Sequence, residues 1–435
     1  MNSFKILKGH NIKLSGVPTE SIKVSENPDI IVFHPSSIKN IKTKLMVKEG
    51  DDVKIGSPLF YDKNNQEVYF VSSCSGKIEK IIFGPKRVVE RIEIKNNNND
   101  YFTFNLQVSI DSLQKSGLWT YFRQKPFSKI PHYGSMPKSI YISTMPTEPF
   151  AINYEFLFNN IDNYLQKGID VLKDIFNCDI NISSFLNNNT FEKLNNVNHY
   201  SFNNLHPAGN VGVQIHHIKP ISNSNDARWY ISPQNLNRIG EFFTTGKYPN
   251  RQYVNAGGNG LNTNIMYNIL IGTPISNFID LKEGELRIIS GDALNGKEIK
   301  PQNSLNYYDE IISVIKTDNK REFLGWMMPG LNKYSLTNTF LSKLNNNNNA
   351  KLSTKVNGSI RTIIPMGNWD KVMPMNILTE YLVKNILAED IDMMEKLGIY
   401  ECSPEDFSLC AFACQSKVEV SKIIEEGLDL MEKEG

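Results

Sequence analysis

Alternating apolar and polar positions dominate the first quarter of the chain. Residues 42–95 contain short β-rich runs separated by turn residues. Gly50 and Gly56 flank one turn, and Ser75-Gly76 separates two further runs, as hairpin turns require. This pattern predicts a small β domain, which we place at residues 1–105.

The next segment has the spacing of an α/β unit. Residues 138–144 predict a buried strand, residues 159–176 have the apolar spacing of an amphipathic helix, and residues 179–182 predict another short strand. Strand, helix and strand in this order favour an α/β layer with a crossover connection. We therefore expect a Rossmann-like α/β domain over residues 106–252.

Strand-like patterns return after residue 252. Short β-rich runs alternate with glycine turns and one short helix through the EFLGWMMPG segment at 322–330. This alternation suits a β-grasp (SLBB-like) domain over residues 253–344.

The tail, residues 350–435, is predicted to be a helical domain. Ser403-Pro404 combines a cap residue with proline at the first helical position, and Ser416 with Glu419 has capping-box spacing. Two apolar stripes are expected to face the core. One stripe is Ile377, Leu378, Tyr381, Leu382 and Ile386, and the other is Val420, Ile423, Ile424, Leu428 and Met431.

Two asparagine runs, at 96–99 and 345–349, are expected to be exposed connectors between these units. The predicted fold class is thus a multidomain mixture of α/β and α+β units.

Composition supports an ordered chain and limits its partners. Of 435 residues, 40% are hydrophobic and 21% are charged, which is typical of globular proteins. The formal charge of +1 provides no broad field for polyanions, so nucleic acid is not an expected partner. The N-terminus lacks the apolar region of a secretory signal, and no apolar run reaches the length of a membrane span. We expect a soluble cytoplasmic chain that meets a membrane only through partners.

The order VKEGDDVKIGSPLF followed by SSCSGKI resembles the barrel-sandwich hybrid of lipoyl and biotinyl carriers. Asp62-Lys63 even matches the modified Asp-Lys pair of such carriers. Asn64, Asn65 and Gln66 follow it, however, and the spacing to Gly76 is long for a carrier hairpin. An unmodified scaffold is the favoured interpretation.

Uncommon strings spread over nearly the whole chain resemble the NqrA family, the A subunits of the sodium-translocating NADH:quinone oxidoreductase. They occur in the same order as in that family. The strings are KPFSKIP at 125–131, HPAGNVGVQIHHIKP at 206–220, RIISGDALNG at 287–296, EFLGWMMPG at 322–330, IPMGNWDKVMPMNIL at 364–378 and PEDFSLCAF at 404–412.

This resemblance implies a peripheral subunit on the cytoplasmic face of the membrane. The family's six-subunit translocase passes electrons from NADH to ubiquinone or menaquinone and exports sodium. FMN, FAD, riboflavin and iron-sulfur centres belong to the partner subunits. The chain is expected to dock and stabilise the complex, especially at the integral-membrane quinone-reducing subunit, without being catalytic alone. The alternative is a subunit that binds quinone directly and transfers electrons.

The architecture also resembles the NADH-binding flavoprotein of respiratory complex I and the C subunit of the Rnf complex, which use a glycine-rich loop for a nucleotide phosphate. Residues 116–131 stand in its place, where only Gly117 is small and Trp119, Tyr121 and Phe122 are bulky. Tight FMN or NADH binding is therefore not expected. The glycine cluster at 256–260 has no clear helix after it and is interpreted as a turn.

Five cysteines without a CxxC pair favour a reducing compartment over a disulfide framework. Cys402, Cys410 and Cys414 lie close in sequence, but most iron-sulfur clusters need four thiolates. Simple thiols are the favoured interpretation, with a vestigial metal site as the lesser alternative. We assign no metal ligand and no catalytic residue.

The histidines of the 206–220 string form the most conspicuous polar group. Imidazole can donate a hydrogen bond to a quinone carbonyl, which makes His206, His216 and His217 candidate quinone ligands. Pro207 and the nearby glycines indicate a sharp bend, and loop or core histidines that already have partners are the favoured interpretation.

Overall fold

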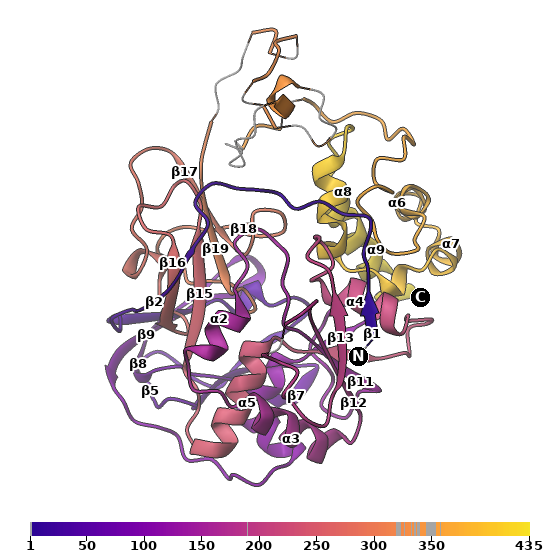
Figure 1. Ribbon diagram of the computed structural model, residues 1–435. Coiled ribbons are helices and arrows are strands. Elements are labelled where there is room, and N and C mark those ends of the chain that lie inside the picture. Colours follow the sequence, from indigo (N-terminus) through magenta and orange to yellow (C-terminus); the bar gives the residue numbers. More distant parts are fainter. Residues whose placement is uncertain are drawn as a thin grey trace.

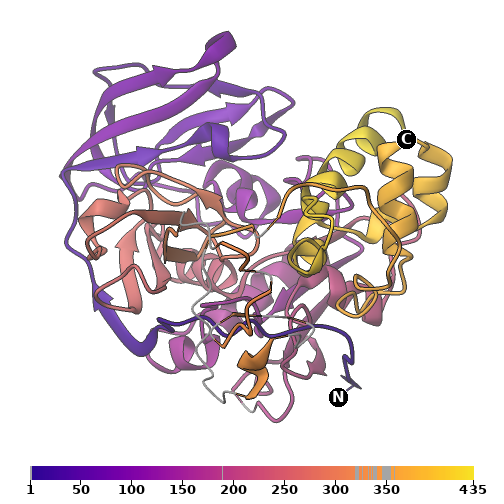
Figure 2. The same cartoon turned by 90° about the horizontal axis from the view of Figure 1, so that it is seen from above.

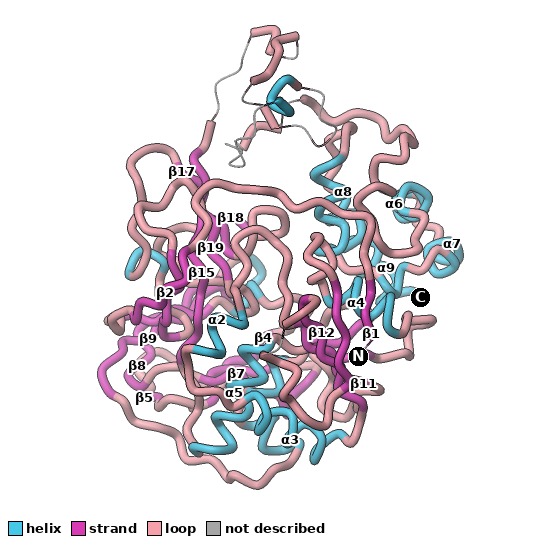
Figure 3. Tube along the Cα trace, viewed as in Figure 1, coloured by secondary structure: helices cyan, strands magenta, loops and turns pink. Residues whose placement is uncertain are grey.

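Two six-stranded sheets, a pair of smaller sheets and a helical C-terminal region make up the molecule (Figure 1). Figure 3 shows the strands concentrated in the N-terminal three quarters of the chain and the C-terminal region built of helices and loops. The computed structural model describes residues 2–188, 190–318, 323–325, 327–331, 333–334, 336, 340–344, 354–356 and 358–435. The asparagine run at 345–349 lies outside these residues.

The predicted small β domain is confirmed as two facing sheets. Gly50 and Gly56 adopt positive φ angles of 91° and 94°, which only glycine adopts readily, so the turns form where the sequence predicted them. The four-stranded sheet has the order β3 (Ile30–Phe33), β9 (Val89–Asn98), β8 (Ser75–Phe83) and β5 (Asp52–Val53), and the three-stranded sheet has β4 (Thr43–Leu45), β6 (Pro58–Asp62) and β7 (Asn65–Val71).

Two local predictions in this region were wrong. Ser75-Gly76 begins strand β8 instead of forming a turn, because the bend lies at residues 72–74, where Ser72 bonds the backbone of Cys74. The asparagine run does not begin as a connector either, since strand β9 continues to Asn98. Its partner β8 supplies backbone hydrogen bonds that offset the low strand preference of asparagine.

The first two strands pair outside this β domain. Strand β1 (Asn2–Phe4) joins the α/β sheet beside β13, and β2 (Thr19–Val24) joins the third sheet beside β16. We call the connecting residues 5–18 the N-terminal strap. It crosses the molecule between the two large sheets, as the indigo trace in Figure 1 shows.

The α/β sheet has five parallel strands and one antiparallel edge. Its order is β1, β13 (Asn198–Phe202), β12 (Asp179–Phe185), β11 (Ser139–Ser143), β14 (Arg228–Tyr230) and β10 (Arg123–Lys125). Alternate residues of β11 serve two cores. Ile140 and Ile142 pack with α3 (Leu165–Phe176) and α5 (Pro233–Thr245), whereas Tyr141 packs with α4 (Val211–Ile218) and the C-terminal region.

The strand, helix and strand prediction for this sheet is confirmed, with one boundary moved. The helix expected from residue 159 begins at Leu165, and α2 (Tyr154–Asn159) is a separate short helix. Asn237 bonds the backbone N–H of Tyr164 and so helps to fix the break. Helix α1 (Ile110–Lys115) precedes the sheet.

The third sheet contains strands where the sequence predicted them from residue 251 to residue 316. Its order is β18 (Lys297–Glu298), β17 (Leu286–Ser290), β19 (Ile311–Lys316), β15 (Arg251–Gly257), β16 (Ile265–Leu270) and β2. The glycine cluster at 256–260 forms a turn between antiparallel β15 and β16, as expected. The described residues of the 322–330 segment form turns and no strand.

The C-terminal region packs against the α4 face of the α/β sheet. Figure 2 shows it as a separate yellow lobe beside the sheets. Its helices are α6 (Thr379–Leu387), α7 (Ile391–Lys396), α8 (Ser408–Ala413) and α9 (Val420–Glu434), with a 3-10 turn at Pro404–Phe407 before α8. No helix of the described ranges combines the length and the apolar character that a membrane crossing requires.

The helix starts and stripes of this region were predicted only in part. Pro404 opens a helical turn with Ser403 at its N-cap position, as expected, although the Ser403 side chain makes no capping hydrogen bond. Ser416 does not cap α9, because Glu419 occupies the N-cap position of that helix. Ser416 instead donates to the backbone carbonyl of Thr362. The α9 stripe faces the core, whereas Leu378 and Tyr381 of the other stripe are 60% and 63% exposed.

Candidate functional site

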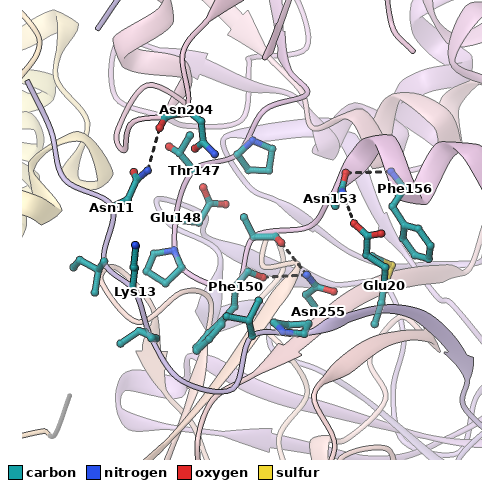
Figure 4. A pocket seen from close by; sticks show the side chains of 18 of the residues that line it. Asn11, Lys13, Glu20, Thr147, Glu148, Phe150, Asn153, Phe156, Asn204 and Asn255 are labelled. Carbon is teal, nitrogen blue, oxygen red and sulfur yellow. Dashed lines mark hydrogen bonds between the residues drawn. The ribbon is translucent and has the colours of Figure 1, made fainter. Parts of the chain in front are cut away.

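A cavity of about 590 Å³ lies between the N-terminal strap and the loop that follows strand β11. The strap contributes Asn11 and Lys13, and the loop contributes residues 146–151 (Figure 4). The backbone N–H of Gly258 bonds the Gly16 carbonyl and so holds the far end of the strap against the third sheet. A Cβ at Gly16 would meet the Gly258 carbonyl carbon at 2.4 Å, so this approach needs glycine.

The cavity lies at the carboxyl ends of the parallel strands. Strand β11 leads into the lining loop, β12 ends at Phe185, which lines the cavity, and β13 is followed by Asn204, which also lines it. The chain then crosses to the other side of β11 to form β14, so the strand order reverses there. Ligands of open α/β sheets bind outside the carboxyl ends of the strands at such a reversal. This makes the cavity the candidate binding site.

His206 connects two walls of this cavity without lining it. Its backbone N–H donates to the side-chain oxygen of Asn11 at 2.6 Å, and its carbonyl accepts from His10. Its ring Nδ1 lies 3.1 Å from the hydroxyl of Thr147, which also accepts from the Gly209 N–H. His206 therefore fixes the strap and the loop after β11 relative to each other, without being part of the cavity lining.

The electrostatics of the site centre on Glu148. Burial, together with the nearby carboxylates of Asp292 and Glu310, raises the pKa of Glu148 to about 7. Burial also raises the pKa of Asp292 to about 6. Glu310 accepts hydrogen bonds from Tyr154 and Ser232. The charges of Asp292 and Glu310 thus disfavour ionisation of Glu148.

The other two candidate histidines lie away from this cavity, in the last turn of α4. His216 is held on both sides, by the Glu401 carboxylate at 2.6 Å and by the Asn376 N–H, which donates to Nε2 at 3.0 Å. The His217 ring lies 6.0 Å from the Phe4 ring, and burial lowers its pKa. Of the three histidines that the sequence singled out, the structure brings only His206 to the candidate site.

Comparison with known proteins covers the whole chain. Family models match residues 4–97, as "NqrA N-terminal barrel-sandwich hybrid domain", and residues 106–248, as "NqrA second alpha/beta domain". Two relatives are named as the A subunit of Na(+)-translocating NADH-quinone reductase. The one from Vibrio atlanticus (strain LGP32) is 32% identical over 99% of both chains, and the one from Pasteurella multocida (strain Pm70) is 32% identical over 99% of both chains. The chain belongs to the NqrA family. The expected resemblance is therefore confirmed, and so is the barrel-sandwich domain.

Among solved structures, a chain of an NAD+-reducing [NiFe]-hydrogenase in its H2-reduced state superposes with a TM-score of 0.34. It is 8% identical and covers 42% of this chain and 41% of its own, a level too low to define a shared fold.

Residues 116–131 of this NqrA-family chain are filled by large buried side chains. Trp119 and Phe122 are fully buried in the α/β core, and the Trp119 ring lies 5.2 Å from the Trp229 ring. The Trp119 Nε1–H donates to the Pro131 carbonyl at 2.9 Å. Residues 116–122 pack as core between α1 and β10.

The carrier-like hairpin is fixed in place. Asn65 is buried, donates to the Pro131 carbonyl at 3.0 Å and accepts from the Tyr133 N–H at 2.9 Å. A carrier must move its modified lysine between sites, whereas this attachment holds the hairpin tip on the α/β domain. The geometry agrees with an unmodified scaffold.

The three C-terminal cysteines are buried thiols. Cys410 lies in α8, and Cys402 and Cys414 flank the helical turns around it. Burial raises the pKa of Cys402 and Cys410. Among the described residues, no group of three or more metal-binding side chains is placed to hold an ion.

Sequence patterns alone did not single out Thr147, Glu148 or Asn11. One signal for the first two was present, because the segment 146–150 directly follows a buried strand of a predicted parallel sheet. Asn11 gave no such signal, since its role depends on where the strap runs.

Proposed function

We propose that this chain is a peripheral subunit of a sodium-pumping NADH:quinone reductase, where it docks and stabilises the complex on the cytoplasmic face. Its redox cofactors would reside in partner subunits. The full-length relationship to proteins named as the A subunit of that reductase supports this role.

An exposed apolar surface on the C-terminal region carries the proposal. We call it the C-terminal apolar surface. Glu380 bonds the backbone N–H groups of Met366 and Gly367, so the start of α6 adjoins the segment before it. Exposed large apolar side chains that gather in one region are typical of an interaction site. Its residues are Val356, Ile360, Ile364, Met366, Leu378, Tyr381 and Leu387, with exposed fractions from 56% to 78%.

The favoured occupant is the integral-membrane quinone-reducing subunit. An anionic lipid surface is less suitable, because membrane-surface sites combine apolar side chains with clustered cations. Here Lys355 pairs with Asp318 at 2.8 Å, and Lys384 shares α6 with Glu380. Apolar contact with a protein fits this balance of charge better.

The test replaces Ile360 and Tyr381 together by aspartate and measures recovery of the membrane subunits on the tagged chain. We expect recovery to fall strongly while the circular dichroism and melting of the isolated chain stay unchanged. Phe83→Asp is the matched control, because Phe83 is 53% exposed but lies on the β8 strand. Full assembly of the double variant, or equal loss in the control, would contradict the docking role.

A second candidate function is direct quinone binding. The observation that favours it is the cavity next to His206, which is large enough for a quinone ring and has partly apolar walls. Titration of the chain with a short-chain quinone tests it. Saturable binding that Phe150→Ala weakens would support the idea, and no binding to the chain alone or within the complex would exclude it.

A further inference from the structure

The cavity beneath the strap carries more negative than positive charge. Glu148 and Glu20 line it, and Lys13, which is exposed, is the one cation among the lining residues that the structure describes. Asp292 and Glu310 lie behind Glu148, close enough to disfavour its ionisation. In Figure 4 the Glu148 carboxylate lies between Asn204 and Phe150.

The negative charge of the cavity is unexpected for a site at the carboxyl ends of parallel strands. Nucleotides bind at the carboxyl ends of parallel strands because backbone N–H groups and cations stabilise their phosphates. Here a phosphate would face Glu148 and, behind it, Asp292 and Glu310. A neutral quinone would not be repelled by these carboxylates, but it would not reduce the repulsion that the carboxylates of Asp292 and Glu310 exert on Glu148. A positively charged ligand would relieve it.

The remaining lining suits an organic cation. Phe150, Phe156 and Phe185 contribute aromatic rings, which attract cations by their negative faces. Asn255 donates to the carbonyls of Phe150 and Ala151 and fixes the loop beside Glu148. The cavity volume of about 590 Å³ exceeds what a bare metal ion needs.

We propose that this cavity binds a small organic cation with an amino or guanidinium group, held by the Glu148 carboxylate among the phenylalanine rings. The proposal rests on the cavity and is independent of the docking role. If the cavity binds no cation, the outcome of the assembly test is unaffected. If the assembly test fails, cation binding in the cavity is likewise unaffected.

The test is calorimetric titration of the full chain with agmatine, which carries both an amino and a guanidinium group. AMP and a short-chain quinone are the comparison ligands. We expect saturable agmatine binding, no binding of AMP, and no displacement of agmatine by quinone. Loss of a charge-assisted hydrogen bond predicts that Glu148→Gln weakens binding by about tenfold or more.

Two further variants separate a built site from general surface charge. Glu283→Gln is the matched control, since Glu283 is exposed and does not line the cavity, and it should leave the affinity nearly unchanged. At about pH 8, where Glu148 is mostly ionised with or without Asp292, Asp292→Asn removes one further negative charge near the site and should weaken binding less than Glu148→Gln. Asp292→Asn also serves as the second variant if Glu148→Gln fails to fold.

The pH dependence gives an independent readout. The titratable and charged groups around Glu148 are Asp292, Glu310, Glu20 and Lys13. Burial raises the pKa of Glu148 to about 7 and that of Asp292 to about 6, so these two carboxyl groups become ionised as the pH rises through this range. Agmatine binding should therefore tighten from about pH 6 to about pH 8. The proposal would be overturned if agmatine did not bind, if AMP bound instead, or if quinone displaced agmatine. Equal losses of affinity in Glu283→Gln and Glu148→Gln would overturn it as well.

Discussion

The Lys125 ammonium lies 3.4 Å from the Asp406 carboxylate, and both side chains are at most 1% exposed. Lys125 ends the edge strand β10, and Asp406 lies in the 3-10 turn before α8, so the pair joins the α/β sheet to the C-terminal region. Lys125 also donates to the Ser403 hydroxyl. Gly212 leaves room for the pair, since a Cβ there would meet the Asp406 oxygen at 2.0 Å.

Replacing only one member of this buried ion pair should strongly destabilise the protein. Lys125→Met leaves a buried carboxylate without its cation and should destabilise the protein by about 3–5 kcal/mol. Combining it with Asp406→Leu removes both charges and should recover most of the loss. Urea unfolding followed by circular dichroism measures both effects. Lys138→Met, which removes a partly exposed partner of Asp226, is the control and should cost less than about 1 kcal/mol. Equal effects in the two single variants would contradict the role of the buried pair.

Ser403 shows what a local sequence pattern can and cannot predict. Serine before proline and acidic residues predicts a capped helix, and a helical turn does begin there, but the hydroxyl binds Lys125, 278 residues away in sequence. Strands β1 and β2 were not predicted, since they lie before the β-rich runs that the sequence showed, and their partners β13 and β16 are far away in the chain. Strands β11 and β12 were predictable, since each carries alternating isoleucines that pack into the same core.

The candidate site was less predictable than the fold. The bulky side chains of Trp119 and Phe122 pack in the α/β core, and their size was visible in the sequence. His206 was noticed for its ring, yet its backbone contact with Asn11 matters equally, and no motif encodes it. Glu148 gains its properties from Asp292 and Glu310, which come from the third sheet and its loops.

Trp119 should stabilise the α/β core, and its removal should not create a flavin-binding site. Trp119→Ala leaves a cavity in the α/β core and should cost about 3–5 kcal/mol. FMN should remain unbound, because the segment would still lack a glycine-rich phosphate loop. Urea unfolding and quenching of FMN fluorescence measure the two outcomes. Tyr133→Ala, at a side chain that is 44% exposed, should change stability little. Stoichiometric FMN binding by the Trp119 variant would show that the bulky side chain alone excludes the flavin.

His206 should stay neutral over the physiological range. Burial lowers its pKa to about 4. The unfolded chain then binds a proton at a pH where the folded chain does not, so this group's contribution to stability is lost as the pH falls from about 6.5 toward 4. Histidine NMR signals, assigned with a His206→Asn variant, should show no titration of His206 between about pH 5 and pH 8. A midpoint near the unperturbed value would contradict its buried role behind Thr147.

Glu148 should make the protein more stable in mild acid than at neutral pH. Its folded pKa of about 7 lies above the unfolded value, so the folded chain holds a proton that the unfolded chain has released. The free energy of unfolding therefore falls as the pH rises from about 4.5 to about 7, by at most roughly 3 kcal/mol, and by less where water in the cavity screens the charge. Glu148→Gln should flatten this slope, and Asp292→Asn should reduce it, because removing one carboxylate lowers the pKa of the other. Urea unfolding at several pH values measures the slope, and Glu20→Gln should keep it. If Glu148→Gln leaves the pH dependence of the free energy of unfolding unchanged, Glu148 is not the group that causes it. The electrostatic argument for a cation in the cavity would then be lost.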